Sequence, residues 1–223
     1  MSIQIIGSTG TIANVNGSYF KALCVTSRPV EYGALGLYRI SMISGAMTGT
    51  YNNEEIFQAR WTDCSRLALV WGLSIDGFGT GSPGPGTGFA NMNLVIARNW
   101  TVDGSGGLSA DLSGTSQDLR TSMRPSRMNS IRIGATNNLV EGTKTLDALS
   151  IGQLCFSMRN QSNDIFLPGI KDLYAFLEHT KNPSPVVLTE NEGLVCRMTM
   201  PGVIGSLTFQ FGVTMSWSEV VYY

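Results

Sequence analysis

Segment 207–218 carries the strongest structural signal in the sequence. Apolar residues stand at every second position, and small or polar residues lie between them. The apolar positions are Leu207, Phe209, Phe211, Val213, Met215 and Trp217. Successive side chains of a β-strand point to opposite faces, so this pattern places the apolar side chains on one face of a strand, whereas a helix would scatter them around its axis. The segment therefore predicts a long strand with one buried face.

The segment just before it shows the same alternation. Its apolar positions are Leu194, Cys196, Met198 and Met200. Residues 201–205 (PGVIG) separate the two segments, and proline and glycine favour turns. We therefore expect the two segments to form a β-hairpin with a long loop.

Shorter runs of the same kind predict further strands. They cover residues 19–25, 38–42, 57–61, 67–75, 91–96, 131–133, 154–158 and 186–188. Segment 67–75 is apolar on much of both faces, which predicts a central strand. Segment 170–179 has apolar residues at helical spacing and predicts either a short helix or an irregular strand. Many short strands with glycine-rich connections indicate an all-β fold, either an antiparallel β-sandwich or a jelly roll, with at most one short helix.

Length and composition indicate a single domain and argue against nucleic-acid and membrane partners. The 223 residues show no composition shift, so we expect a single β-sandwich domain over 18–223, preceded by an N-terminal arm over 1–17. Charged residues make up 14%, against about a quarter in typical domains, and the net charge is −1 without a basic run. This argues against nucleic-acid binding. The sequence also contains no long apolar stretch and no signal peptide. We therefore expect that the protein is made in the host cytoplasm and does not associate with membranes.

The cysteines and the only histidine do not form a recognisable metal or catalytic motif. The cysteines are Cys24, Cys64, Cys155 and Cys196, which are far apart in the sequence. Three of them, Cys24, Cys155 and Cys196, lie in apolar runs, which predicts reduced core residues, although two disulfides remain possible. His179 has no partner with catalytic or metal-ligand spacing. We therefore expect no cofactor, no metal and no enzymatic activity.

Two loop features resemble functional motifs only superficially. Segment 79–88 (GTGSPGPGTG) is glycine-rich but lacks the lysine of a phosphate-binding loop, which favours a flexible connection that touches a neighbouring subunit. Acidic residues lie mostly at strand ends and in turns, where their side chains bond to nearby backbone amides. A pair of carboxylates distant in sequence, as in glycoside hydrolases, remains an alternative.

Aromatic residues and the C-terminal segment supply the candidate contact surfaces. Trp61, Trp71 and Trp217 lie among aliphatic residues on strand faces, which predicts core positions, whereas Trp100 stands at a strand end and is expected to be exposed. Segment 219–223 (EVVYY) is apolar and poor in charge, so it needs a partner surface or a final strand position. The predicted partner contacts are Ile3, Ile5, Pro83, Pro85, Trp100, Val220, Val221, Tyr222 and Tyr223.

Several short patches resemble uncharacterised virion proteins of tailed bacteriophages. The clearest are residues 188–195 (LTENEGLV) and 211–219 (FGVTMSWSE), and residues 33–41 (GALGLYRIS) and 143–149 (TKTLDAL) are also similar. The resemblance implies a head-associated β-sandwich, a capsid cement or decoration protein on the phage head surface. Its partners would be the major capsid protein and further copies of itself, as a homotrimer. A tail or fibre β-sandwich that binds a carbohydrate or host receptor remains the alternative, and no catalytic residues come with the resemblance.

Overall fold

The computed structural model describes residues 36–49, 51–80, 88–113, 117–118, 124–158, 171–175, 185–200 and 208–221. The chain divides into two compact units, Met1–Glu31 and Tyr32–Tyr223. The described residues all belong to the second unit. The arm expected over 1–17 and the strand expected over 19–25 lie outside them, as does most of the 79–88 loop.

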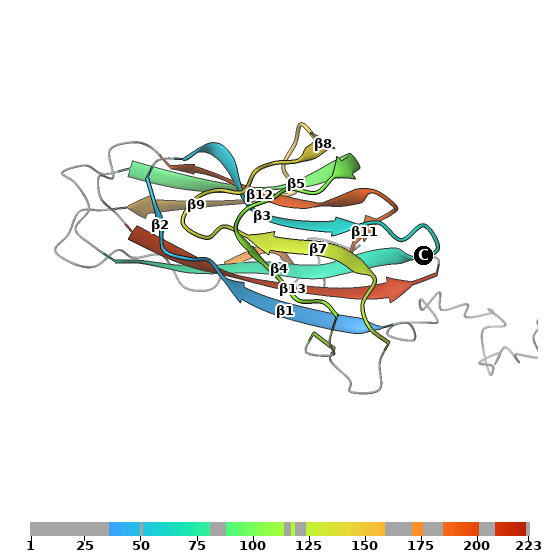
Figure 1. Ribbon diagram of the computed structural model, residues 1–223. Helices are drawn as coiled ribbons and strands as arrows, with labels where there is room; N and C mark the ends of the chain where they lie inside the picture. The colour runs from blue at the N-terminus through green and yellow to red at the C-terminus, as the bar shows by residue number, and fades with distance from the viewer. Residues whose placement is uncertain are drawn as a thin grey trace, which may run out of the picture. The chain divides into compact units, whose positions relative to one another are not determined.

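The first sheet has six antiparallel strands, with β13 and β4 at its centre (Figure 1). Strand β1 pairs with one side of β13, and β2 pairs with the same strand further along. Strands β10 and β11 both pair with β4. The strands are β1 (Leu37–Ile43), β2 (Met47–Thr48), β4 (Leu67–Thr80), β10 (Lys171–Ala175), β11 (Val186–Leu188) and β13 (Thr208–Val220). The central position expected for segment 67–75 is confirmed, because β4 has neighbours on both sides.

The second sheet has seven antiparallel strands in the order β6-β7-β3-β12-β5-β8, and β9 also pairs with β5. The strands are β3 (Tyr51–Trp61), β5 (Gly88–Val102), β6 (Leu108–Ser109), β7 (Met128–Ile133), β8 (Thr143–Leu146), β9 (Gly152–Met158) and β12 (Glu192–Met200). The alternating patterns predicted neither β2, β6 nor β8, which are too short for a period of two to stand out.

The strand pairing is nested from the two ends of the unit inward. Strand β1 pairs with β13, β3 with β12, β4 with β10 and β11, and β5 with β8 and β9. Members of successive pairs alternate between the two sheets. This is the connectivity of a long hairpin wrapped around a sandwich, which defines a jelly roll. The all-β prediction is confirmed, and no helix is present among the described residues.

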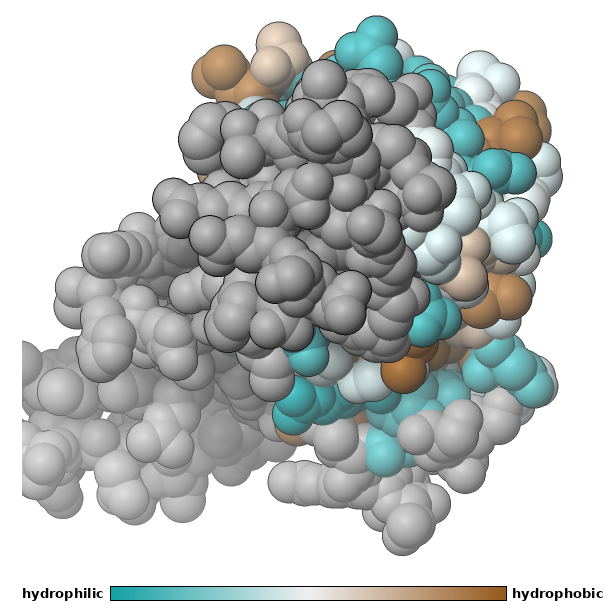
Figure 2. Space-filling view, turned by 90° about the vertical axis from the view of Figure 1, so that its left-hand side faces the viewer, coloured by the Kyte–Doolittle hydropathy of each residue, from teal (hydrophilic) through white to brown (hydrophobic). Residues whose placement is uncertain are grey.

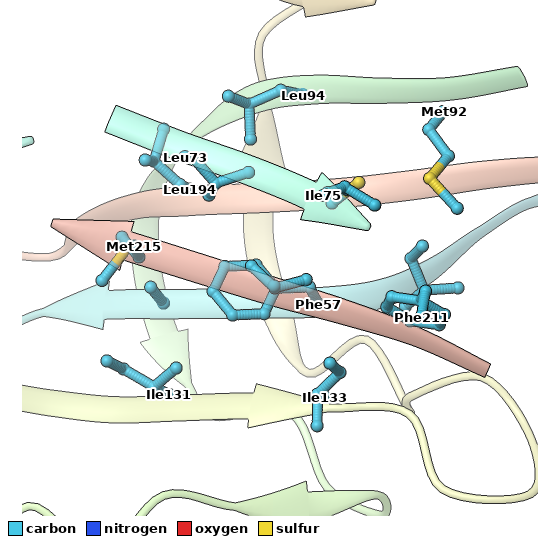
Figure 3. Packing of buried hydrophobic residues seen from close by; sticks show 14 of the residues in the cluster. Phe57, Leu73, Ile75, Met92, Leu94, Ile131, Ile133, Leu194, Phe211 and Met215 are labelled. Carbon is cyan, nitrogen blue, oxygen red and sulfur yellow. The ribbon is translucent and has the colours of Figure 1, made fainter. Parts of the chain in front are cut away.

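Apolar side chains from both sheets fill the space between the layers (Figure 3). Strand β13 contributes Phe209, Phe211, Val213, Met215 and Trp217, all nearly or fully buried, whereas the residues between Phe209 and Trp217 are only half-buried. The alternation therefore predicted the buried face of this strand correctly. Each such side chain stabilises the fold by roughly 1.5 to 3 kcal/mol relative to an exposed one.

The predicted hairpin between segments 194–200 and 207–217 is wrong. Strand β12 lies in the seven-stranded sheet and β13 in the six-stranded one, so the chain crosses from one layer to the other between them. Turn-forming residues specify a chain reversal but not the strand beside which the chain continues.

Segment 171–175 forms a strand, which decides against the helical alternative there, and residues 176–179 lie outside the described part. No helix long and apolar enough to cross a membrane occurs in the described residues.

The three described cysteines are free thiols, but only one is a core residue. Cys196 is fully buried, as expected, and burial raises the pKa of its thiol to about 12. Cys155 is exposed, contrary to the prediction, because it lies on β9 with its side chain opposite to that of Leu154, which packs against the core. Cys64 is exposed and Cys24 lies outside the described residues.

Candidate functional site

A row of polar side chains lies on the face of β3 that points away from the interlayer core. The pairing of β3 with β12 shifts register at Ile56, so that Ile56 and Phe57 both join the core. Such a bulge turns the residues on either side of it, Glu55 and Gln58, to the outer face. Glu55 and Gln58 are fully buried there, since Gly104 lies close to the amide of Gln58 and Lys144 reaches the carboxylate of Glu55.

Trp100 lies in this covered region, and the expectation that it is exposed is wrong. Asn99, just before it, has a left-handed backbone (φ 50°), and the pairing of β5 with β8 shifts register between Arg98 and Val102. The indole packs with Val95, Ala97 and Val195 in a small second core. Its Nε1–H donates to the carbonyl of Val102 over 2.9 Å. A strand end therefore does not expose this tryptophan, because segments distant in sequence cover it.

Lys144 of the edge strand β8 reaches the polar row on β3. Its Nζ lies 2.8 Å from Oε2 of Glu55 and 4.5 Å from the centroid of the Trp100 ring, and it also donates to the carbonyl of Glu141. The side chains of Lys144 and Glu55 are 3% and 0% exposed. Burial raises the pKa of Glu55, and the hydrogen bond and charge of Lys144 oppose that shift. The pair therefore ties the edge strand β8 to β3, from which β12 and β5 separate it in the sheet.

The residues 191–193 (NEG), which carried the phage-like pattern, have structural roles. Asn191 has a left-handed backbone (φ 62°) in the turn before β12, and its side chain accepts a hydrogen bond from Arg60 over 3.1 Å. Glu192 accepts hydrogen bonds from the backbone N–H of Thr189 and from Arg98. A Cβ on Gly193 would lie 2.7 Å from the Trp100 ring, so glycine leaves room for the indole.

A cavity of about 370 Å³ opens beside the end of β13. Its lining residues are Arg66, Arg124, Pro125, Ser126 and Arg127. Glu219, which is fully buried, lies beside this lining. One oxygen of Glu219 accepts hydrogen bonds from the Ser126 hydroxyl (2.8 Å) and the Arg127 backbone N–H (2.7 Å), and the other lies 3.4 Å from Arg66. Burial raises the pKa of Glu219, and these hydrogen bonds and Arg66 oppose the shift.

The arginines of this cavity come from separate parts of the sequence. Arg66 lies in the connection from β3 to β4, and Arg124 and Arg127 precede β7. No basic run predicted them together, although the short segment 124–127 (RPSR) was visible in the sequence. The fold therefore creates a local concentration of positive charge in a chain whose net charge is −1.

The predicted partner contacts are only partly within the described residues. Trp100 and Val220 are buried, whereas Val221 is 49% exposed. Ile3, Ile5, Pro83, Pro85, Tyr222 and Tyr223 lie outside the described residues, as does His179. Figure 2 shows that, on the visible described part of one face, hydrophobic side chains are separated by hydrophilic ones.

The described part of the chain contains no group of three or more histidine, cysteine or acidic side chains arranged to hold a metal ion. The chain matches no protein-family model, no curated protein and no solved structure.

Proposed function

We propose that this chain is a structural virion protein without enzymatic activity, a cement or decoration protein that binds the major capsid protein on a phage head and associates with itself. The observation that carries the proposal is the jelly-roll connectivity, because viral capsid proteins are among the main users of this architecture. One fold serves many functions, so this role is assigned by analogy with viral capsid proteins. The four phage-like sequence patches also support it.

The described interior suits a rigid binding module. Large aromatic side chains such as Trp61, Trp217 and Phe57 are fully buried between the sheets and leave the interior packed with apolar atoms. A cement protein stabilises a shell by binding the assembled state in preference to free subunits. Its binding surface matches the local symmetry of the shell, and no chemical step is required.

The proposal is tested by adding the purified chain to phage heads that lack it. We expect the chain to co-sediment with intact heads and to raise the temperature at which they release DNA. Val221→Asp should weaken this binding, because the exposed Val221 is a predicted contact beside the buried end of β13. Ile43→Asp is the matched control, since Ile43 is similarly exposed but was not predicted as a contact.

Two results would contradict this role. Detection of the chain only on isolated tails would place it elsewhere in the virion. Assembly of closed shells from the purified chain alone would make it a shell subunit rather than a cement protein.

A tail or fibre module that binds a carbohydrate or receptor is the second candidate, because lectin domains also use the jelly roll. Stacking on sugars requires exposed aromatic rings, yet Trp61, Trp100 and Trp217 are fully buried. Trp71 is half-buried and donates to the Ser218 hydroxyl. Specific binding on a glycan array, without binding to heads, would favour this candidate over the first. Glycan cleavage that is lost on replacing one carboxylate would instead establish a hydrolase.

A further inference from the structure

We propose that the cavity lined by Arg66, Arg124, Ser126 and Arg127 is a binding site for an oxyanion, either a phosphate or a carboxylate group. The inference is independent of the proposed function, because it rests only on the geometry and charge of this cavity. This cavity is the arginine pocket.

The arginine pocket has a pre-arranged polar wall. Glu219 fixes one side of it, since it accepts hydrogen bonds from the hydroxyl of Ser126 and from the backbone N–H of Arg127. The side chain of Arg66 is only 13% exposed and lies 3.4 Å from the same carboxylate. The segment that carries Arg124 is also held in place, because its carbonyl accepts a hydrogen bond of 2.7 Å from the Tyr38 hydroxyl. The backbone around the pocket is therefore anchored to buried residues of β1 and β13.

Three guanidinium groups line the arginine pocket, and Glu219, Asp63 and Asp118 are acidic groups near it. Glu219 offsets one of the three guanidinium groups. The hydrogen bond from the Ser65 hydroxyl lowers the pKa of the Asp63 carboxyl most, and the charges of Arg66 and Arg127 lower it further. Within the described residues, the guanidinium groups of Arg124 and Arg127 form no ion pair. Like charges gathered around one cavity repel each other, and a bound anion relieves that repulsion.

The donors available fit an oxyanion better than other ligands. A guanidinium presents a planar set of N–H donors and no acceptor, and it matches the paired oxygens of carboxylate or phosphate groups. The volume of about 370 Å³ lies near the lower end of the range of small-ligand sites, which suits a phosphate or an inserted acidic side chain. Phosphate ions and carboxylates of a protein partner are two sources of the same chemistry, and the experiment separates them.

The test measures binding to the full chain by calorimetry, with inorganic phosphate in one series and a short polyglutamate peptide in the other. Sodium chloride at matched ionic strength corrects for screening. We expect saturable binding in at least one series. Arg124→Gln and Arg127→Gln should each weaken that binding about tenfold, the loss typical of one charge-assisted hydrogen bond. Arg39→Gln is the control, because it removes the same charge from an exposed position on β1 outside the pocket.

The variants also distinguish a built site from general attraction to positive charge. Arg127→Lys keeps the charge but loses the planar donors, so it should retain only part of the affinity. The proposal is overturned if neither probe gives saturable binding, or if Arg39→Gln weakens binding as much as the pocket variants. Binding of duplex DNA that the three arginine-to-glutamine variants weaken equally would show a diffuse nucleic-acid surface and would also overturn it. Arg124 and Arg127 are both exposed, so circular dichroism should show that their variants are folded.

Discussion

Replacing Lys144 with methionine should destabilise the protein in a strongly pH-dependent way. The substitution keeps a long side chain beside Trp100 but leaves Glu55, which is 0% exposed, without its ammonium partner. A buried carboxylate without a counter-charge is so unfavourable that it takes up a proton instead. The free-energy cost of the substitution is then the cost of keeping Glu55 protonated in the folded state.

The size of this cost follows from the pH. An unfolded glutamate has a pKa of 4.5, and each pH unit above that value makes protonation about 1.4 kcal/mol more costly. The pH-dependent cost is therefore about 3 kcal/mol near pH 7 and below about 1 kcal/mol near pH 5. Burial already raises the pKa of Glu55 in the unmodified protein, so the stability of that protein also falls as the pH rises. The difference in stability between the variant and the unmodified protein therefore depends less on pH than the variant's own stability does. Lys144→Met should cost about 2 kcal/mol more near pH 7 than near pH 5.

A second contribution is independent of pH. The ammonium of Lys144 lies 4.5 Å from the Trp100 ring centroid, and loss of that contact costs about 1 kcal/mol. The total near neutral pH is then about 3 to 4 kcal/mol, in the range for removing one partner of a buried ion pair.

Urea unfolding followed by tryptophan fluorescence at the two pH values measures the difference. The double variant Glu55→Gln/Lys144→Met is the control, because it carries neither charge and should lose stability equally at both pH values. An equal loss for Lys144→Met near pH 5 and near pH 7 would refute the reasoning, since it would mean that Glu55 remains ionised without its partner.

Three further predictions concern other parts of the fold. Gly193→Ala should destabilise the protein by about 1 to 3 kcal/mol in urea unfolding, because the added Cβ would lie 2.7 Å from the Trp100 ring; a neutral effect would contradict the observed packing. Leu73→Ala should lower the free energy of unfolding by roughly 2 to 5 kcal/mol, as measured by thermal unfolding, since Leu73 is fully buried. The matched control is Leu149→Ala, which should lower it by less than about 0.5 kcal/mol because Leu149 is 81% exposed. Burial raises the pKa of Glu219, so the folded state binds more protons than the unfolded state and the free energy of unfolding should fall as the pH rises above 4.5. Glu219→Gln should make the free energy of unfolding less dependent on pH. An unchanged pH dependence would exclude Glu219 as its cause.

The candidate sites were less predictable than the strands. The sequence indicated Trp100 as an exposed contact, but the structure buries it under residues that follow it by some forty positions, including Lys144. The arginine pocket was not predicted at all, because Arg66 and Arg124 stand far apart in the sequence. Both outcomes have the same cause, which is that exposure and charge density depend on contacts between distant segments.

By itself, the sequence determined the class of fold and the buried face of its strongest strand. Strand alternation is a local property, so residues 207–217 reveal which side of β13 faces the core without knowledge of its neighbours. Only the tertiary structure decided that β12 and β13 belong to different sheets and that the pairing is nested as a jelly roll. The physical reason is that an apolar strand face is satisfied by any complementary apolar layer. The choice of partner depends on how all the strands pack together, and no short segment of the sequence records it.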